Sequence, residues 1–126
     1  MSGLIYDAGA LLAAERRDTR LWALHDEAMG AGILPVVPVV VLAQAWRGGP
    51  QAELSRLLRG CRILPDTEPI GRAAGRACAA AGAVDVVDAI VVVSAAASAA
   101  VVVTSDVPDL ARLAEAVGVR LRLHQV

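Results

Sequence analysis

Three aspartates stand where apolar segments begin or end. Asp7 follows the run LIY, Asp88 lies near the start of a long uncharged stretch, and Asp106 follows VVVTS at its end. Carboxylates that are brought together repel one another, which raises their pKa values unless a cation joins them. Mg²⁺ and Mn²⁺ prefer oxygen ligands of this kind, and such an ion can activate water and stabilise charge on a phosphodiester. The pattern suggests metal-dependent hydrolysis, provided that the fold brings the three acids together.

Turn residues divide the chain into alternating strands and helices. We expect strands at residues 4–6, 33–37, 61–64, 100–104 and 119–123. We expect helices that end near residue 14 and that cover 19–29, 38–46, 52–58, 69–81, 85–97 and 107–116. This alternation is typical of a parallel sheet with helices on both faces. The length fits a single domain, residues 1–126.

The alternation also determines where the three acids go. Asp7 and Asp106 lie just past the C-terminal ends of their strands. A helix between two parallel strands runs antiparallel to them, so the first turn that contains Asp88 lies at the same edge. The carboxylates should meet at the edge where open α/β sheets usually bind ligands.

A purely structural interpretation of the acids exists. Asp85 and Asp88 can cap a helix and favour its dipole, and Asp106 and Asp109 can do the same for the next helix. For Asp85 we favour capping, and for Asp109 both interpretations stay open. Capping explains Asp7 less well, because Ala-Gly follows it rather than a helix signal.

Composition excludes several other sites. All twelve basic residues are Arg, and a chain without Lys cannot be an ordinary P-loop, receiver or haloacid-dehalogenase-like protein. His25 and His124 are too few for zinc. Cys61 and Cys78 lack metal-ligand spacing and are interpreted, like His25, as structural residues of a protein in the reducing cytoplasm. The net charge of −1 favours no class of partner.

The uncharged stretch between Asp88 and Asp106 is shorter than the roughly twenty apolar residues that span a bilayer. It contains Ser94 and Ser98 and is rich in weakly hydrophobic Ala. We therefore interpret it as a buried helix followed by an internal strand, with no membrane contact. The N-terminus MSGLIYDAG lacks a basic and an apolar region, so export is not expected.

Four motifs carry a resemblance to a known family. LIYDAGALL, PVVPVVVLAQAWRGG, DVVDAIVVVSA and VVVTSDVPDL, in this order and spacing, resemble the PIN domain of VapC-type toxin ribonucleases. The resemblance covers nearly the whole chain. It implies a three-layer α/β/α sandwich with a central parallel sheet, cleavage of RNA with Mg²⁺ or Mn²⁺, a cognate antitoxin as partner, and a homodimer.

The resemblance also assigns residues. Asp7, Asp88 and Asp106 match the metal-site acids, Asp109 matches a further acid, and Thr104 matches the strand hydroxyl that supports the site. Gln44 stands where the family usually has a Glu. Its amide oxygen can coordinate a metal or hold a metal-bound water but adds no negative charge. Metal binding should therefore be weaker than with four acids, and catalysis could be weak or absent.

Several arginines and both tryptophans are candidates for further contacts. Arg47 can face a phosphate or lie solvated or acid-paired on its helix. Two groups can form basic patches or a salt-bridged surface, the second being the default: Arg16, Arg17 and Arg20, and Arg56, Arg59 and Arg62. Trp22 and Trp46 lie on apolar helix faces and fit a core or a dimer interface.

The favoured hypothesis is a cytoplasmic, metal-dependent ribonuclease that acts as a toxin. A rival from another class is a PIN-fold binding module that has lost catalysis through Gln44 and pairs with an antitoxin or RNA. A third is a metal-dependent phosphatase or DNA flap nuclease that uses the same acids.

Overall fold

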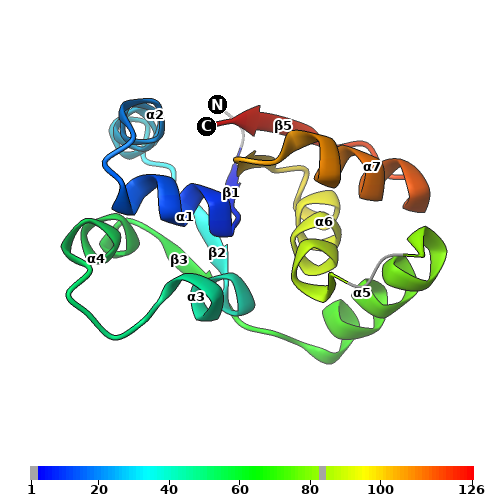
Figure 1. Ribbon diagram of the computed structural model, residues 1–126. Helices are drawn as coiled ribbons and strands as arrows, with labels where there is room; N and C mark the ends of the chain where they lie inside the picture. The colour runs from blue at the N-terminus through cyan, green and yellow to red at the C-terminus, as the bar shows by residue number, and fades with distance from the viewer. Residues whose placement is uncertain (1–2, 83–84) are drawn as a thin grey trace.

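A parallel sheet lies between two layers of helices in the computed structural model, which describes residues 3–82 and 85–126 (Figure 1). The strands are β1 (Leu4–Tyr6), β2 (Val36–Pro38), β3 (Arg62–Leu64), β4 (Val101–Thr104) and β5 (Arg122–Gln125). Their order is β3-β2-β1-β4-β5, and each neighbouring pair is parallel. The predicted α/β/α sandwich with a central parallel sheet is confirmed.

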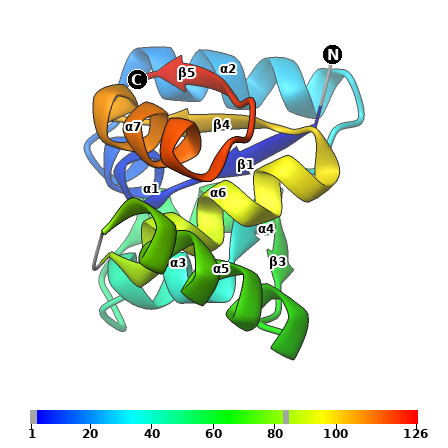
Figure 2. The same cartoon turned by 90° about the vertical axis from the view of Figure 1, so that its right-hand side faces the viewer.

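The helices divide between the two faces. They are α1 (Ala8–Glu15), α2 (Thr19–Gly30), α3 (Val39–Ala45), α4 (Ala52–Arg59), α5 (Glu68–Ala81), α6 (Val86–Ser98) and α7 (Val107–Val117). Helices α1, α2 and α4 form one layer and α5, α6 and α7 form the other, while α3 follows β2 (Figure 1). The turned view shows β1 and β4 side by side and running in the same direction, with α6 and α7 in front of them (Figure 2).

The central strands are buried on both faces, which explains their continuous apolar sequence. Strand β1 is at most 3% exposed at every residue, and Val102 and Val103 of β4 are fully buried. Helix α6 packs five apolar side chains into the core: Ala89, Ile90, Val91, Val92 and Ala95. The uncharged stretch is thus one helix and one strand, as predicted. No single helix among residues 3–82 and 85–126 is long and apolar enough to cross a bilayer; α5 and α6 together reach that composition but bend by 113°.

Two strands begin later than the sequence predicted, for one physical reason. Gly32 and Gly118 adopt left-handed backbone at φ 72° and 74°. The next residue in each case turns its N–H back to the helix, with Ile33 N donating to Ala28 O at 2.9 Å and Val119 N to Ala114 O at 3.0 Å. These bonds close α2 and α7 and postpone β2 and β5 to Val36 and Arg122.

Pro38 was predicted in the first turn of a helix and is instead the last residue of β2. Its ψ of 140° is extended, so it caps α3 from outside and the helix begins at Val39. Helix α3 then ends at Ala45, before the predicted Trp46. Both differences shorten the helix that carries Gln44.

A buried glutamine that the sequence did not single out fixes the end of α3. The side-chain oxygen of Gln51 accepts a hydrogen bond from Arg47 N at 2.7 Å. Its amide nitrogen donates to Ala45 O and to Glu15 Oε1, both at 2.9 Å. Gln51 therefore ties the loop of residues 47–51 to the C-terminal ends of α3 and α1.

The start of α1 packs against the segment that follows β4. A Cβ atom on Gly9 would lie 2.0 Å from Ser105 Oγ and 2.9 Å from Ser105 N. Because the backbone nitrogen cannot move aside as a flexible side chain can, only a glycine fits this contact. This contact holds the N-terminal end of α1 against the segment that follows β4, and these two segments carry Asp7 and Asp106.

Gly9→Ala should destabilise the protein, although Ala normally stabilises a helix interior relative to Gly by up to about 1 kcal/mol. Gly75→Ala in α5 is the matched control, since an added methyl there meets nothing within 4 Å. Thermal unfolding should show a lower Tm for Gly9→Ala and an unchanged or higher Tm for Gly75→Ala. An equal rise in both variants would contradict the contact with Ser105.

Candidate metal and hydrolytic site

Asp7 and Asp106 lie at the same edge of the sheet because their strands are neighbours. Tyr6 is level with Val103, and Asp7 N donates to Val103 O at 3.2 Å. Thr104, which is fully buried, accepts a hydrogen bond from Asp106 N at 2.9 Å. Burial raises the pKa of Asp7, and a hydrogen bond from the Thr104 side chain to the Asp7 carboxylate partly offsets that rise. Thr104 therefore links the two acids, in the supporting position that the sequence predicted.

Three aspartates at this edge cap helices. Asp7 accepts a hydrogen bond from Ala10 N at 3.0 Å, Asp85 from Asp88 N at 3.0 Å, and Asp106 from Asp109 N at 3.3 Å. The capping role of Asp85 is confirmed. The expectation that capping explains Asp7 poorly is wrong, because α1 begins directly after it. Each cap occupies one carboxylate oxygen, so a carboxylate with two oxygens can cap and also bind a cation.

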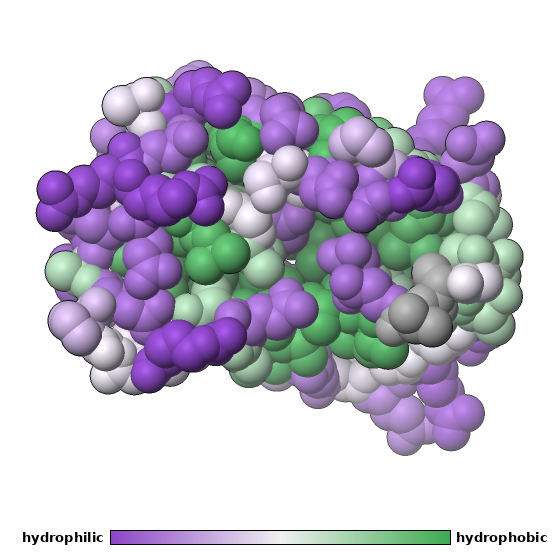
Figure 3. Space-filling model, viewed as in Figure 1, coloured by the Kyte–Doolittle hydropathy of each residue, from purple (hydrophilic) through white to green (hydrophobic). Residues whose placement is uncertain are grey.

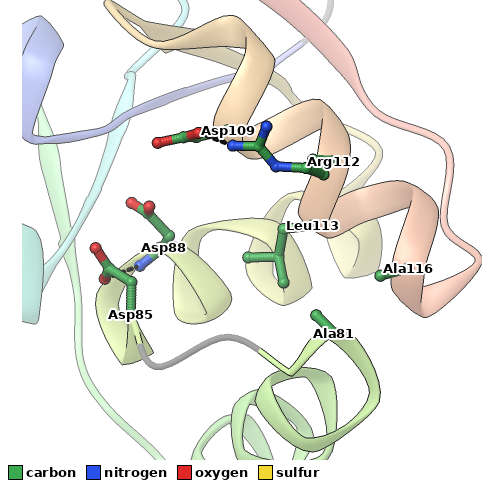
Figure 4. Close-up of a pocket in the computed structure, with 7 residues that line it drawn as sticks. All are labelled: Ala81, Asp85, Asp88, Asp109, Arg112, Leu113 and Ala116. Carbon is green, nitrogen blue, oxygen red and sulfur yellow. Dashed lines mark hydrogen bonds and ion pairs between the residues drawn. The ribbon is translucent and has the colours of Figure 1, made fainter.

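Asp88 and Asp109 occupy equivalent places in the first turns of α6 and α7. Figure 4 shows both side chains extending to the same side, with Asp85 below them. Helices α1, α6 and α7 all begin at the edge where β1 and β4 end (Figure 2). The partial positive charge of a helix N-terminus favours ionised carboxylates there.

The acids influence one another's ionisation. Burial raises the pKa of Asp88 to about 6, and the charges of Asp85, Asp7 and Asp109 add to the rise. Burial is also the main cause that raises the pKa of Asp7, with the Asp106 charge acting in the same direction. Asp7 is 8% exposed. The negative charges of Asp7 and Asp88 are therefore costly in the folded protein without a cation.

Next to these acids lies a pocket of about 300 Å³ between α5, α6 and α7, here called the Asp88 pocket (Figure 4). Its polar lining is Asp85, Asp88, Asp109 and Arg112, and its apolar wall is Ala81, Leu113 and Ala116. Arg112 forms an ion pair with Asp109 one turn before it. In the view of Figure 3 the middle of the molecule is hollowed, with apolar surface in its depth and polar residues around it. Sequence analysis did not single out Arg112, although its spacing of three from Asp109 on a helix was visible.

The predicted ligand set does not form a closed metal cage. Within residues 3–82 and 85–126, no group of three or more His, Cys, Asp or Glu side chains is arranged to hold one ion. Gln44 lies exposed on α3. The assignment of Asp7, Asp88, Asp106 and Asp109 as metal ligands, and of Gln44 as a catalytic residue, stays a prediction.

The arginines considered for RNA binding are mostly engaged elsewhere. Arg17 and Arg56 both pair with Glu53, at 3.9 and 2.7 Å, so the alternative of an acid-paired surface fits them. Arg47 donates from its guanidinium to Ala43 O and Trp46 O. These bonds hold the Arg47 side chain against the C-terminal end of α3.

A buried cluster on the other face supports Tyr6, the residue before Asp7. The hydroxyl of Tyr6 and His25 Nδ1 are 2.8 Å apart, and His25 is 3% exposed. Trp22 contacts the His25 ring edge-on, and the Arg56 guanidinium lies 3.6 Å from the centre of the Trp22 ring. Trp22 and His25 are therefore structural, as predicted, whereas Trp46 is 42% exposed rather than buried.

Comparison with solved structures identifies the architecture. No protein-family model matches the sequence, and no curated protein matches it. A chain of the VapBC2 assembly from Rickettsia felis, solved with a DNA fragment from its promoter, aligns over 98% of both chains with a TM-score of 0.74 at 14% identity. The chain has the PIN-domain fold of VapC. PAE2754 from Pyrobaculum aerophilum aligns over 98% of this chain and 83% of its own, with a TM-score of 0.66 at 18% identity. At 14% and 18% identity, the similarity of this chain to the two structures shows the fold alone.

The raised pKa of Asp88 predicts a pH dependence of stability. Because this pKa is about 6 in the folded state, protonation of Asp88 stabilises the fold. The contribution is complete below the ordinary Asp pKa and is lost as the pH rises through about 6. In EDTA, Asp88→Asn should therefore raise the Tm at pH 7.5, and this gain should shrink at pH 5.

The quantity to compare is the difference in Tm between Asp88→Asn and the wild type at each pH, because acidification changes the stability of both proteins through His25 as well. Burial lowers the pKa of His25, so its protonation in the unfolded chain works in the opposite direction. Asp66→Asn, in the exposed loop between β3 and α5, serves as the control. A gain for Asp88→Asn that is the same at both pH values would contradict the raised pKa of Asp88.

Proposed function

We propose that this chain is a metal-dependent endoribonuclease that acts in the cytoplasm as the toxin of a type II toxin-antitoxin pair. The observation that carries the proposal is the gathering of Asp7, Asp88 and Asp106 at the carboxyl edge of the sheet, with the pKa of Asp88 raised to about 6. The PIN fold shared with a chain of a VapBC2 assembly supports it.

The residues fit a divalent ion. Asp7 is buried and Asp88 is half-buried, and a hard cation relieves the cost of their negative charges. Mg²⁺ commonly binds through one or two carboxylates while keeping several waters. A closed cage of three protein ligands is therefore not required. Asp7, Asp88 and Asp106 would hold Mg²⁺ or Mn²⁺, with Asp109 beside them. When bound, the ion supplies an activated water and stabilises negative charge on the phosphodiester.

The chain's own residues would hold the acids in place for this chemistry. Thr104 hydrogen-bonds both Asp7 and the backbone of Asp106, which fixes their separation. The cap bonds restrain the rotation of Asp7 and Asp106. Gln44 would orient water through its amide without adding charge. The attack would be in-line hydrolysis, with no covalent intermediate on the protein.

The partners follow from the same proposal. The solved VapBC2 assembly contains toxin and antitoxin together, so we propose a cognate antitoxin for this chain, with RNA as substrate and a homodimer as the assembly. The rival function, a PIN-fold binding module without catalysis, is favoured by two observations. Gln44 is not an acid, and the described residues form no closed cage.

Mn²⁺ should raise the Tm, because an ion that binds the folded state stabilises it, by about 2.7 kcal/mol at a hundred times its Kd. Asp106→Asn should reduce this rise. Asparagine keeps the cap of α7, so the substitution removes charge without removing the helix start. Asp18→Asn, the same change at the cap of α2, is the control. A flat response of the wild type to millimolar Mn²⁺ would support the binding module.

Purified protein incubated with total RNA should produce new 5′ ends with Mn²⁺ and none with EDTA. Asp7→Asn should lose these ends, because the cap of α1 is kept while a ligand charge is removed. Asp18→Asn should cleave as the wild type does. Wild-type protein that binds its antitoxin but leaves all RNA intact would overturn the ribonuclease proposal.

Gln44→Glu should tighten Mn²⁺ binding by about tenfold, equivalent to ~1.4 kcal/mol, because it adds a negative charge beside the ion. Titration calorimetry measures the change directly. An unchanged Kd would mean that the side chain at position 44 points away from the ion.

A further inference from the structure

The Asp88 pocket combines three features, each of which can contact a part of a bound nucleotide or its metal ion. Carboxylates line the side shared with the proposed metal site, the guanidinium of Arg112 lies beside one of them, and three apolar side chains form the remaining wall. Figure 4 shows Leu113 between the acids and Ala116, below the Arg112 side chain. Its volume of about 300 Å³ accommodates one nucleoside-sized group.

Arg112 can leave Asp109 for another anionic partner at little cost in free energy. The Arg112 side chain is 73% exposed and that of Asp109 is 51% exposed. An exposed pair of this kind contributes little to stability. A phosphate offers the planar guanidinium a bidentate partner with more negative charge. Arg112 is therefore held loosely in the free protein and close to the acids.

An RNA strand that approaches this edge meets carboxylates and needs a positive charge nearby. Arg112 is the basic side chain that lines the Asp88 pocket. Arg47 is bonded to carbonyls of its own helix end, and Arg56 is stacked on Trp22. Arg62 begins β3 and lies at the opposite edge of the sheet. The position of Arg112 sets it apart from these arginines.

We propose that Arg112 binds a phosphate of the RNA strand next to the bond that is cleaved, and that the apolar wall of the Asp88 pocket takes the sugar or base of that nucleotide. This inference rests on the proposed function. A cation held by the acids would weaken the attraction of Asp109 for Arg112, which would leave the guanidinium available to a phosphate. The wall carries no aromatic ring, so base identity should matter little.

Fluorescence anisotropy with a labelled single-stranded RNA oligonucleotide in Ca²⁺, checked on a gel for intact RNA, tests the inference. Arg112→Gln should weaken binding about tenfold, as expected for one charge-assisted hydrogen bond. The slope of log K against log salt should fall by about 0.7, the value for one phosphate contact on a single strand. Arg112→Lys should restore the slope.

Two controls separate a contact from a general effect of charge. Arg72→Gln breaks the equally exposed Arg72–Glu68 pair on α5 and should leave binding unchanged. Arg112→Gln combined with Glu115→Gln, an exposed acid on α7, keeps the net charge and should bind as weakly as Arg112→Gln alone. Recovery in the double variant would overturn the inference, as would weaker binding with an unchanged salt slope.

The result also separates this inference from the function beneath it. If the wild type binds RNA and Arg112→Gln binds equally well with the same slope, the role of Arg112 is wrong and the proposed function stands. If the wild type binds no RNA in the presence of the cation, both fall.

Discussion

The parallel pairing of β1 with β4 is the constraint on which the site depends. These strands lie at the centre of the sheet and are buried on both faces, so their register cannot slip without exposing apolar side chains. The register places Asp7 level with Thr104, and the buried Thr104 side chain then joins residues almost a hundred positions apart in sequence. The separation of Asp7 and Asp106 is thus fixed by the core rather than by the surface.

Asp7 and Asp106 serve both the fold and the candidate chemistry. Three helices start at the carboxyl edge, and each start is closed by an aspartate. A helix start tolerates and even favours a carboxylate, which is why acids can accumulate there without unfolding the protein. Burial and, after it, repulsion from the neighbouring acids still oppose ionisation, and together they raise the pKa of Asp88. Structural and functional interpretations of these residues are therefore compatible.

Most of the architecture was predictable because it depends on local signals. Apolar runs marked the strands, and the alternation with helices placed Asp7, Asp88 and Asp106 at one edge. The wrong element boundaries arose where a backbone N–H group that follows a helix bonds back to that helix instead of joining the sheet. Ile33 and Val119 resemble strand residues, but their N–H groups close helices. The cap role of Asp7 was missed because nothing in Ala8-Gly9 announces a helix.

Parts of the candidate site could not be predicted from the sequence, for a different reason. The Asp88 pocket exists because α5 and α7 pack around the start of α6, and periodicity does not specify such packing. Arg112 therefore looked like one surface arginine among several. Gln51 gave no signal either, since a glutamine in a Gly-Pro-rich loop rarely predicts a buried anchor. The exposure of Gln44 likewise follows from where α3 ends.

The anchoring of Gln51 has a mechanical consequence for the site. One amide group donates hydrogen bonds to the C-terminal ends of both α1 and α3 and so restrains the position of one relative to the other. A shift of the Gln44 backbone toward the aspartate that opens α1 would strain these bonds. Rotation of the Gln44 side chain leaves them intact, and its reach by that route is the length of a glutamine.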